Sequence, residues 1–348
     1  MIRVLVVDDS ALIRRILTDM LNSAPDIEVV GAATDPFMAR DKIKALNPDV
    51  LTLDIEMPRM DGITFLRNLM RLHPMPVVMV STLTEQGAEI TLEALSIGAV
   101  DFVTKPKMDV ARTLTDYVDE LTGKIRTAAR ARFNLARRRS GAEPPRPRPP
   151  TPSMMNIATT EKIIAIGAST GGTEAIKDVL MGMPPDAPGI VIAQHIPQGF
   201  SGAFAERMNR MTKLSVKEAE HGDQVLPGHA FVAPGGMHLE LARNGTRYFC
   251  RVLDTEPVNR HKPSVDVLFR SVLKAAGKNA CAAILTGMGA DGADGITEMN
   301  RAGLFTVAQD EATSIVWGMP GEAVKRNGVN KVLALDEIAT ALLGSFQA

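Results

Sequence analysis

One serine of this chain lies in a sequence that could expose a nucleophile. Ser169 follows the apolar run 163–166, is surrounded by glycine and alanine, and precedes a helix-like segment that starts at Glu174. A strand, a tight turn of small residues and a helix start together expose a side chain and bring backbone N–H groups close to developing negative charge. The same pattern also suits a phosphate-binding loop or a purely structural turn. This stretch alone therefore leaves three interpretations open.

A base and an acid follow two other apolar runs. His195 comes after the run 190–193, and Asp291 lies in a glycine-rich loop after the run 282–285. Because the carboxyl ends of parallel strands lie along one edge of a sheet, both side chains could meet Ser169 there. Histidine can take a proton from serine near neutral pH, and a carboxylate can orient the imidazole. Spacing alone does not exclude the other candidate bases, which are His221, His229, His238 and His261.

The glycine-rich loop 286–295 could have a second role. Backbone N–H groups flanked by glycines can form a nest for an oxyanion. The amide of Met288, which precedes Asp291 in this loop, is the candidate donor. Such a donor can stabilise a transition state by roughly 3 kcal/mol.

Polar side chains also end the apolar runs in the first part of the chain. Successive runs end at these residues: Asp8 and Asp9, Asp54, Ser81 and Thr82, and Lys105. Carboxylates that converge on one edge repel each other unless a hard cation joins them, so they predict an Mg²⁺ site. One carboxylate could then accept a phosphoryl group, with Lys105 pairing the added charge. Helix capping is the alternative for any one of these residues, but capping does not require a lysine beside the acids.

The elements that must position these residues form two α/β units. Five strand–helix repeats begin in residues 1–106 and predict a doubly wound parallel sheet. Residues 107–160 hold a basic helix, expected over 109–135, and a proline-rich linker. Residues 161–348 predict a second α/β domain with a mainly parallel sheet and a β-hairpin.

Length and composition restrict the class of protein. The chain has 348 residues, 45% of them hydrophobic, and a net charge of −1, which fits a folded two-domain protein without a general affinity for nucleic acid. Two distant cysteines fit a reducing compartment. The sequence shows neither a signal peptide nor an apolar run long enough to span a membrane, so we expect a cytoplasmic protein. The arginine-rich stretch 126–139 has no interleaved aromatic residues, which favours a solvated or docking face over nucleic-acid contact.

The N-terminal motifs resemble the receiver domain of two-component response regulators. The resemblance covers residues 1–105 and depends on the segments Val-Asp8-Asp9-Ser, Asp54-Ile-Glu-Met-Pro58-Arg-Met-Asp61-Gly62 and Phe-Val-Thr-Lys105-Pro106. It implies that Asp54 is the phosphoacceptor and that Lys105 contacts the phosphoryl group. It also implies an Mg²⁺ cofactor, for which the ligands would be Asp8, Asp9, Asp54 and the backbone carbonyl of Glu56.

The resemblance implies a conformational switch as well. Ser81 or Thr82 would be the switch hydroxyl, and Ser81 is preferred because it is the first hydroxyl after the strand. Phe102 stands where response regulators often have a rotating aromatic residue. A chemotaxis histidine kinase would be the phosphodonor.

The C-terminal motifs resemble the catalytic domain of bacterial chemotaxis receptor methylesterases. The matching segments are Ile-Gly-Ala-Ser169-Thr-Gly-Gly, Gln-His195-Ile-Pro, Ala-Pro-Gly-Gly236-Met-His238, His261-Lys-Pro-Ser-Val-Asp266 and Leu-Thr-Gly-Met288-Gly-Ala-Asp291-Gly. The order of receiver, linker and esterase matches that family across nearly the whole chain. The resemblance implies that Ser169 is the nucleophile, His195 the general base and Asp291 its orienting acid. Met288 and Thr170, which lies beside the nucleophile, would form the oxyanion hole.

The implied activity is regulated hydrolysis. These enzymes are protein-glutamate methylesterases and protein-glutamine glutaminases, which remove methyl groups from chemoreceptor glutamates and deamidate receptor glutamines. The implied partners are methyl-accepting chemoreceptors, met by peripheral association with membrane receptor arrays, and no nucleic acid. No cofactor is expected in the catalytic domain. The unphosphorylated receiver would block the Ser169 edge, and phosphorylation of Asp54 would relieve that block. A response regulator that only binds a partner, and a general esterase for small metabolites, are the alternatives.

Overall fold

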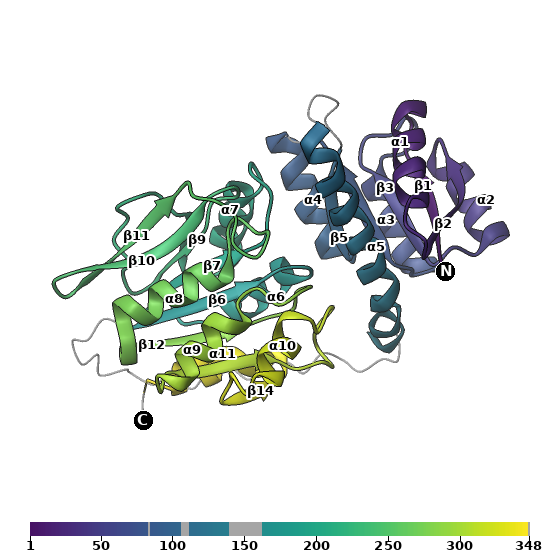
Figure 1. Cartoon of the computed structure of the whole chain (residues 1–348). Coiled ribbons are helices and arrows are strands. Elements are labelled where there is room, and N and C mark those ends of the chain that lie inside the picture. The colour runs from purple at the N-terminus through teal and green to yellow at the C-terminus, as the bar shows by residue number, and fades with distance from the viewer. Residues whose placement is uncertain (83, 106–110, 139–161, 347–348) are drawn as a thin grey trace. The chain divides into compact units, whose positions relative to one another are not determined.

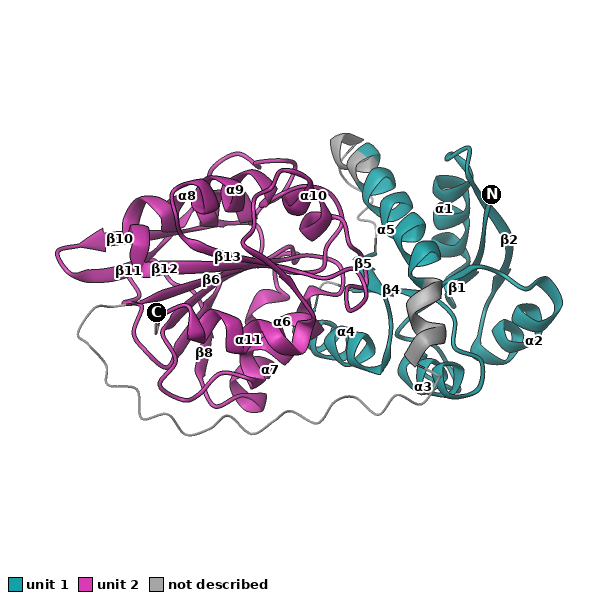
Figure 2. Cartoon of the chain, turned by 90° about the horizontal axis from the view of Figure 1, so that it is seen from below, with its two compact units in different colours: residues 1–142 teal, residues 143–348 magenta. Residues whose placement is uncertain are grey.

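The computed structural model describes residues 1–82, 84–105, 111–138 and 162–346 (Figure 1). The chain divides into two compact units, Met1–Ala142 and Glu143–Ala348, and each is described by itself (Figure 2). Among the described residues, no helix combines the length and the apolar character that a bilayer crossing requires.

The first unit is a doubly wound α/β fold. Its sheet has the strand order β2-β1-β3-β4-β5, and all neighbouring strands are parallel, which confirms the predicted fold class. The central strands are buried, and their near-continuous apolar sequence is typical of strands covered by helices on both faces. The described elements of this unit are β1 (Ile2–Val7), α1 (Ala11–Asn22), β2 (Ile27–Ala33), α2 (Pro36–Leu46), β3 (Val50–Asp54), α3 (Gly62–Leu72), β4 (Val77–Ser81), α4 (Glu85–Ile97), β5 (Asp101–Thr104) and α5 (Ala111–Arg138).

The helix predicted with the linker packs on the first unit. α5 buries Leu121 and Ile125 and contacts β4, β5 and α1. Arg126, which begins the basic stretch, forms an ion pair of 2.7 Å with Asp26, just before β2. Among the described residues, the first compact unit therefore includes α5. The proline-rich segment 143–150, predicted to be a linker, lies outside the described residues.

The second unit is built on a seven-stranded sheet in the order β14-β13-β12-β6-β7-β9-β8. All neighbouring strands are parallel, as a sequence of alternating strands and helices predicts. The predicted hairpin is present as a separate antiparallel pair, β10–β11. The described elements are β6 (Ile163–Ala168), α6 (Gly172–Met181), β7 (Gly189–Gln194), α7 (Ser201–Met211), β8 (Ser215–Glu218), β9 (His229–Val232), β10 (His238–Asn244), β11 (Arg247–Leu253), α8 (Val265–Ala276), a 3₁₀ turn (Gly277–Asn279), β12 (Ala280–Ile284), α9 (Ala293–Arg301), β13 (Phe305–Gln309), α10 (Met319–Lys325), β14 (Lys331–Leu333) and α11 (Leu335–Gly344).

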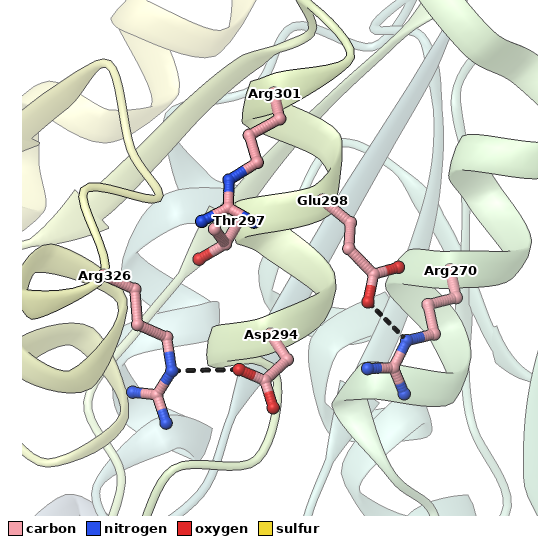
Figure 3. A pocket seen from close by; sticks show the side chains of 6 residues that line it. All are labelled: Arg270, Asp294, Thr297, Glu298, Arg301 and Arg326. Carbon is pink, nitrogen blue, oxygen red and sulfur yellow. Dashed lines mark hydrogen bonds and ion pairs between the residues drawn. The ribbon is translucent and has the colours of Figure 1, made fainter.

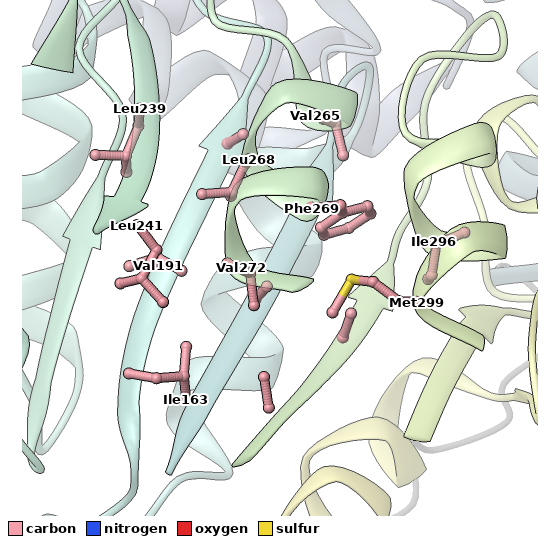
Figure 4. Packing of buried hydrophobic residues seen from close by; sticks show 14 of the residues in the cluster. Ile163, Val191, Leu239, Leu241, Val265, Leu268, Phe269, Val272, Ile296 and Met299 are labelled. Carbon is pink, nitrogen blue, oxygen red and sulfur yellow. The ribbon is translucent and has the colours of Figure 1, made fainter. Parts of the chain in front are cut away.

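Helix α8 joins the main sheet and the hairpin in one core (Figure 4). Its buried residues Val265 and Phe269 pack with side chains of β6, β7 and α9. Gly167 in β6 permits this close approach, because a Cβ there would lie 2.2 Å from Val265 Cγ1 and 3.0 Å from Phe269 Cζ. The N-terminus of α8 therefore lies against the carboxyl end of β6, where Ser169 follows.

Candidate active site

Three adjacent strands carry Ser169, His195 and Asp291 beyond their carboxyl ends. β6 lies between β12 and β7, and Ser169 and His195 directly follow β6 and β7, while Asp291 lies in the loop after β12. The register pairs Ala168 with Gln194, and the backbone N–H of His195 donates to the Ala168 carbonyl at 3.0 Å. The fold thus brings the serine and the histidine to neighbouring positions on one edge of the sheet.

His195 and Asp291 form a buried pair. Nε2 of His195 lies 2.8 Å from Oδ2 of Asp291, and their side chains are 9% and 1% exposed. Within the described residues, the other ring nitrogen of His195, Nδ1, is buried and has no hydrogen-bond partner. Because the carboxylate can only accept, Nε2 carries the proton and Nδ1 presents its lone pair. The pair therefore has the arrangement of a base with one nitrogen held by an acid and the other available for a proton.

Asp291 is surrounded by donors from the start of α8. Its Oδ2 accepts from the Val265 N–H at 2.7 Å, and its Oδ1 accepts from the Ser264 hydroxyl and from Asn259 Nδ2, both at 2.8 Å. Ser264 is also the N-cap of α8. Helix N-terminal N–H groups and hydroxyl donors both favour an ionised carboxylate. The acid is thus fixed in position by the helix and not by the strand that precedes it.

The two buried carboxyl groups of this cluster differ in acidity. Burial opposes ionisation of Asp291, but the hydrogen bond and charge of His195, with the bonds from Asn259 and Val265, hold its pKa well below the usual range. Burial raises the pKa of Asp266, and the Asp291 charge acts in the same direction, against the hydrogen bond from Gly295. Asp291 is therefore the ionised partner of His195 at neutral pH.

The turn that carries Ser169 is fixed by Gln194. Nε2 of Gln194 donates to the carbonyls of Ser169 at 2.9 Å and of His195 at 3.0 Å. Gly172 leaves space for this amide, because a Cβ there would lie 2.1 Å from Gln194 Oε1. Gly171 has φ +75°, a left-handed conformation that glycine adopts without strain. One buried side chain therefore ties together the backbone of both residues.

The loop 286–289 lies directly against Ser169. A Cβ on Gly287 would be 2.8 Å from Ser169 Cβ, so only glycine fits at this point. The Thr286 hydroxyl donates to the Thr170 carbonyl at 3.0 Å and holds the loop to the serine turn. Met288, the next residue, is 39% exposed. These contacts bring the backbone around Met288 and Thr170 to the serine, where an oxyanion hole would have to be.

The first unit gathers its acidic residues at the carboxyl ends of β1 and β3. One ligand atom from each of Asp8, Asp9 and Asp54 lies within 4.8 Å of the other two. Lys105 Nζ lies 2.8 Å from Asp54 Oδ2 and 3.3 Å from Asp8 Oδ2. Burial raises the pKa of Asp54 to about 6, with the Asp8 charge acting in the same direction and Lys105 opposing it. This set of oxygen ligands fits a hard divalent cation, and Glu56 follows in the loop after β3.

The predicted switch residues occupy different environments. Ser81 is fully buried, and its hydroxyl accepts a hydrogen bond from Thr91 at 2.8 Å. Thr82 is only half-buried. Phe102 is 4% exposed, and Lys124 of α5 lies 5.2 Å from its ring centre. Either hydroxyl thus stays a candidate, and the aromatic ring points into the unit.

Comparisons with known proteins identify the family. Residues 164–342 match the family model described as CheB methylesterase, and residues 4–116 match the response regulator receiver domain. The chain belongs to the CheB methylesterase family. The predicted family is therefore confirmed.

Full-length relatives and a solved structure agree with this assignment. The chain is 56% identical to protein-glutamate methylesterase/protein-glutamine glutaminase 1 of Xanthomonas campestris pv. campestris, over 98% of this chain and 96% of that protein. The protein-glutamate methylesterase/protein-glutamine glutaminase of Nitrosomonas europaea is 56% identical with the same coverage. The crystal structure of the Thermotoga maritima CheB methylesterase catalytic domain is 33% identical and has a TM-score of 0.52, over 53% of this chain and 98% of that chain.

The competing histidines of this CheB family member do not share the position of His195. The ring of His221 contacts the Val252 carbonyl of β11, and the ring of His229 contacts the Pro227 carbonyl just before β9. His238 is buried between the Glu256 carbonyl and the Ser264 N–H. His261 is different, because its ring stacks on the ring of His195. The geometry therefore selects His195 as the histidine that contacts Asp291.

Sequence reasoning missed the residues that support the pair. Gln194, Asn259 and Ser264 were not singled out, although they hold Ser169, His195 and Asp291 in place. Only Ser264 had a signal in the sequence, as a helix-capping residue before an apolar run. The contacts of Asn259 join segments distant in the chain, and no local pattern reveals them.

A charged pocket on α8, α9 and α10 contains none of the predicted site residues (Figure 3). Its lining residues are Arg270, Asp294, Thr297, Glu298, Arg301 and Arg326. Ion pairs of 3.0 Å between Arg270 and Glu298, and of 2.9 Å between Arg326 and Asp294, cross it. Such exposed pairs are typical of a solvated surface, so we assign no activity to it.

Proposed function

We propose that this chain hydrolyses methyl esters of specific chemoreceptor glutamates and deamidates specific receptor glutamines. Its relatives are named protein-glutamate methylesterase/protein-glutamine glutaminase. The observation that supports the proposal most directly is the His195–Asp291 pair, in which Nδ1 of His195 is buried and, within the described residues, has no hydrogen-bond partner. In a histidine with a purely structural role, both buried ring nitrogens are expected to have hydrogen-bond partners.

The reaction begins at Ser169. Its Oγ attacks the ester carbonyl carbon while His195 Nδ1 takes the hydroxyl proton. The tetrahedral oxyanion is stabilised by backbone N–H groups at Met288 and Thr170. The carbon–oxygen bond to the methoxy group then breaks, and His195 returns the proton to the departing methanol. In the glutaminase reaction, ammonia leaves in place of methanol.

Water completes the cycle. His195 Nδ1 takes one proton from water as the water attacks the acyl-enzyme, and Ser169 recovers this proton when its bond to the acyl carbon breaks. The glutamic acid side chain that leaves then loses its remaining proton to solvent. Asp291 stabilises the positive imidazolium in both halves, because its charge lies 2.8 Å from Nε2. The Nε2–H tautomer is required throughout, since the opposite tautomer would have no lone pair at Nδ1.

The receiver unit is proposed to regulate this activity. Asp54 accepts a phosphoryl group from a chemotaxis histidine kinase, and Lys105 pairs with the new charge. Asp8, Asp9, Asp54 and the Glu56 carbonyl would hold Mg²⁺, which neutralises charge on the transferring phosphoryl group. Ser81 or Thr82 then turns its hydroxyl toward the phosphoryl group, and Phe102 rotates with it. We assign residues 1–106, continued by α5, to the receiver and residues 161–348 to the esterase domain.

The test is methanol release from purified membranes that contain methylated receptors. Wild-type protein is expected to release methanol, faster with a small-molecule phosphodonor, whereas Ser169→Ala is expected to release none while keeping its unfolding midpoint. Methanol release by a folded Ser169→Ala protein would contradict the nucleophile assignment. Turnover of small soluble esters in preference to receptors would contradict the proposed substrate.

A further inference from the structure

A strained turn contacts both members of the catalytic pair. Val258 and His261 exchange backbone hydrogen bonds of 3.1 and 2.9 Å, and the two residues between them, Asn259 and Arg260, have φ of +53° and +66°. Two successive left-handed residues define a turn that strongly prefers glycine at its second central position. Arginine at that position costs roughly 1 kcal/mol or more. The fold keeps this cost at a point where the turn meets the active site.

Two residues of the turn each contact one member of the His195–Asp291 pair. Asn259 Nδ2 donates to Asp291 Oδ1 at 2.8 Å and to Asp266 Oδ2 at 2.7 Å. The ring of His261 lies face to face with the ring of His195, with centroids 3.7 Å apart and planes inclined by 12°. The turn therefore contacts the acid through a hydrogen bond and the base through a stacked ring.

The base needs a second constraint besides the acid. A single hydrogen bond at Nε2 fixes one corner of the imidazole of His195 but still permits limited rotation about χ2. Such a rotation would tilt the ring and change the direction of the Nδ1 lone pair. A flat ring at van der Waals distance prevents the rotation, because a tilted imidazole would overlap its neighbour.

We propose that His261 is a positioning residue, whose stacked ring fixes the plane of His195 so that Nδ1 faces Ser169. This inference rests on the proposed function of Ser169 and His195. His261 acts through its shape, and no proton passes through it. A planar side chain without a titratable group at position 261 should therefore preserve the position of His195.

Two substitutions separate stacking from acid–base chemistry. His261→Ala removes the ring and is expected to lower kcat for methanol release by roughly 10- to 100-fold, with KM changed less than about 2-fold. His261→Phe restores a flat ring and is expected to recover kcat to within about 5-fold of wild type. His229→Ala is the matched control, because His229 lies at the amino end of β9, on the opposite edge of the parallel sheet, and is expected to match wild type.

Labelling by a fluorophosphonate gives a second measurement that needs no receptor. Its rate reports the reactivity of Ser169 and should fall in His261→Ala and recover in His261→Phe. Wild-type rates in His261→Ala, or a His261→Phe protein as slow as His261→Ala, would overturn the proposal. If His261→Ala does not fold, a folded but slow His261→Phe protein still overturns it. Wild-type protein that neither labels nor releases methanol would instead contradict the proposed function.

Discussion

Replacing Asp291 with asparagine should disable the catalytic pair while preserving its shape. Oδ2 of Asp291 accepts from both His195 Nε2 and the Val265 N–H. If the new amide nitrogen takes the place of Oδ2, its N–H groups face two other donors, His195 Nε2–H and the Val265 N–H. His195 must then move its proton to Nδ1. If the nitrogen takes the place of Oδ1, it opposes the Asn259 amide, and the charge beside His195 is lost in either case.

The expected loss of activity is large. A wrong tautomer, or an imidazolium without its counter-charge, lowers kcat by about 10⁴-fold, which corresponds to about 5.5 kcal/mol. The expected loss of stability is smaller. The Val265 N–H loses a charged acceptor, which costs about 1 to 3 kcal/mol. The removed charge also relieves the repulsion that adds to burial in raising the pKa of Asp266. A net destabilisation of about 1 to 2 kcal/mol is therefore expected for Asp291→Asn.

Asp266→Asn is the matched control. Asp266 is 1% exposed and accepts from Asn259 Nδ2 and from the Gly295 N–H, but no hydrogen bond joins it to His195. Both variants should be assayed for methanol release and for urea unfolding. Asp266→Asn is expected to lose stability with less than about 10-fold loss in kcat. A folded Asp291→Asn protein with kcat within about 10-fold of wild type would refute the assignment of Asp291 as the orienting acid.

The same variant has a defined pH signature. Because the folded state lowers the pKa of Asp291 below its ordinary value of 3.8, its contribution to stability is fully present above that pH. The contribution is lost as the pH falls through the lower folded value. The stability difference between wild type and Asp291→Asn should therefore be constant near neutral pH and shrink in acid, as urea unfolding at several pH values can show. A difference that grows in acid would contradict the ionised state of Asp291.

Three further predictions concern other parts of the chain. Asp54→Asn is expected to keep basal methanol release but lose its stimulation by a phosphodonor, and surviving stimulation would exclude Asp54 as the phosphoacceptor. Gly172→Ala is expected to destabilise by about 1 to 3 kcal/mol in urea, because its Cβ would lie 2.1 Å from Gln194 Oε1. Gly202→Ala, where the nearest atom is 3.8 Å away, should be near neutral, and equal effects at both sites would contradict this packing argument. Phe269→Ala should cost about 3 to 5 kcal/mol by calorimetry, and a cost below about 1 kcal/mol would contradict its place in the core.

The sequence predicts the fold and the edge that carries the site, because both follow from local patterns. Apolar runs mark the buried strands, and parallel strands bring their carboxyl ends to one edge. Ser169 and His195 come directly after their strands, so the sheet alone predicts that the two residues are neighbours. The ring nitrogen that faces Asp291 does not follow from any pattern, because it depends on the rotation of one side chain.

The supporting residues could not be predicted for a related reason. Asn259 contacts Asp291 across 32 residues, and Gln194 contacts the Ser169 carbonyl across 25. Their side-chain types are ordinary in loops and strand ends, so they give no signal before the segments are placed together. The packing of α5 on the first unit likewise depends on the few apolar residues of its buried face, which a basic sequence does not single out.

The position of the acid depends on the packing of the core. Asp291 lies well beyond the end of β12, and its acceptor oxygens are filled by the first residues of α8. The place of α8 depends in turn on Val265, which fits against Gly167 and Gly292; a Cβ on either glycine would lie within 2.4 Å of Val265 Cγ1. The two glycines therefore determine how closely α8 approaches the sheet. The first residues of α8 in turn fix the position of Asp291, the acid that contacts His195. The spacing between base and acid in this enzyme is consequently a property of how closely α8 packs on the sheet.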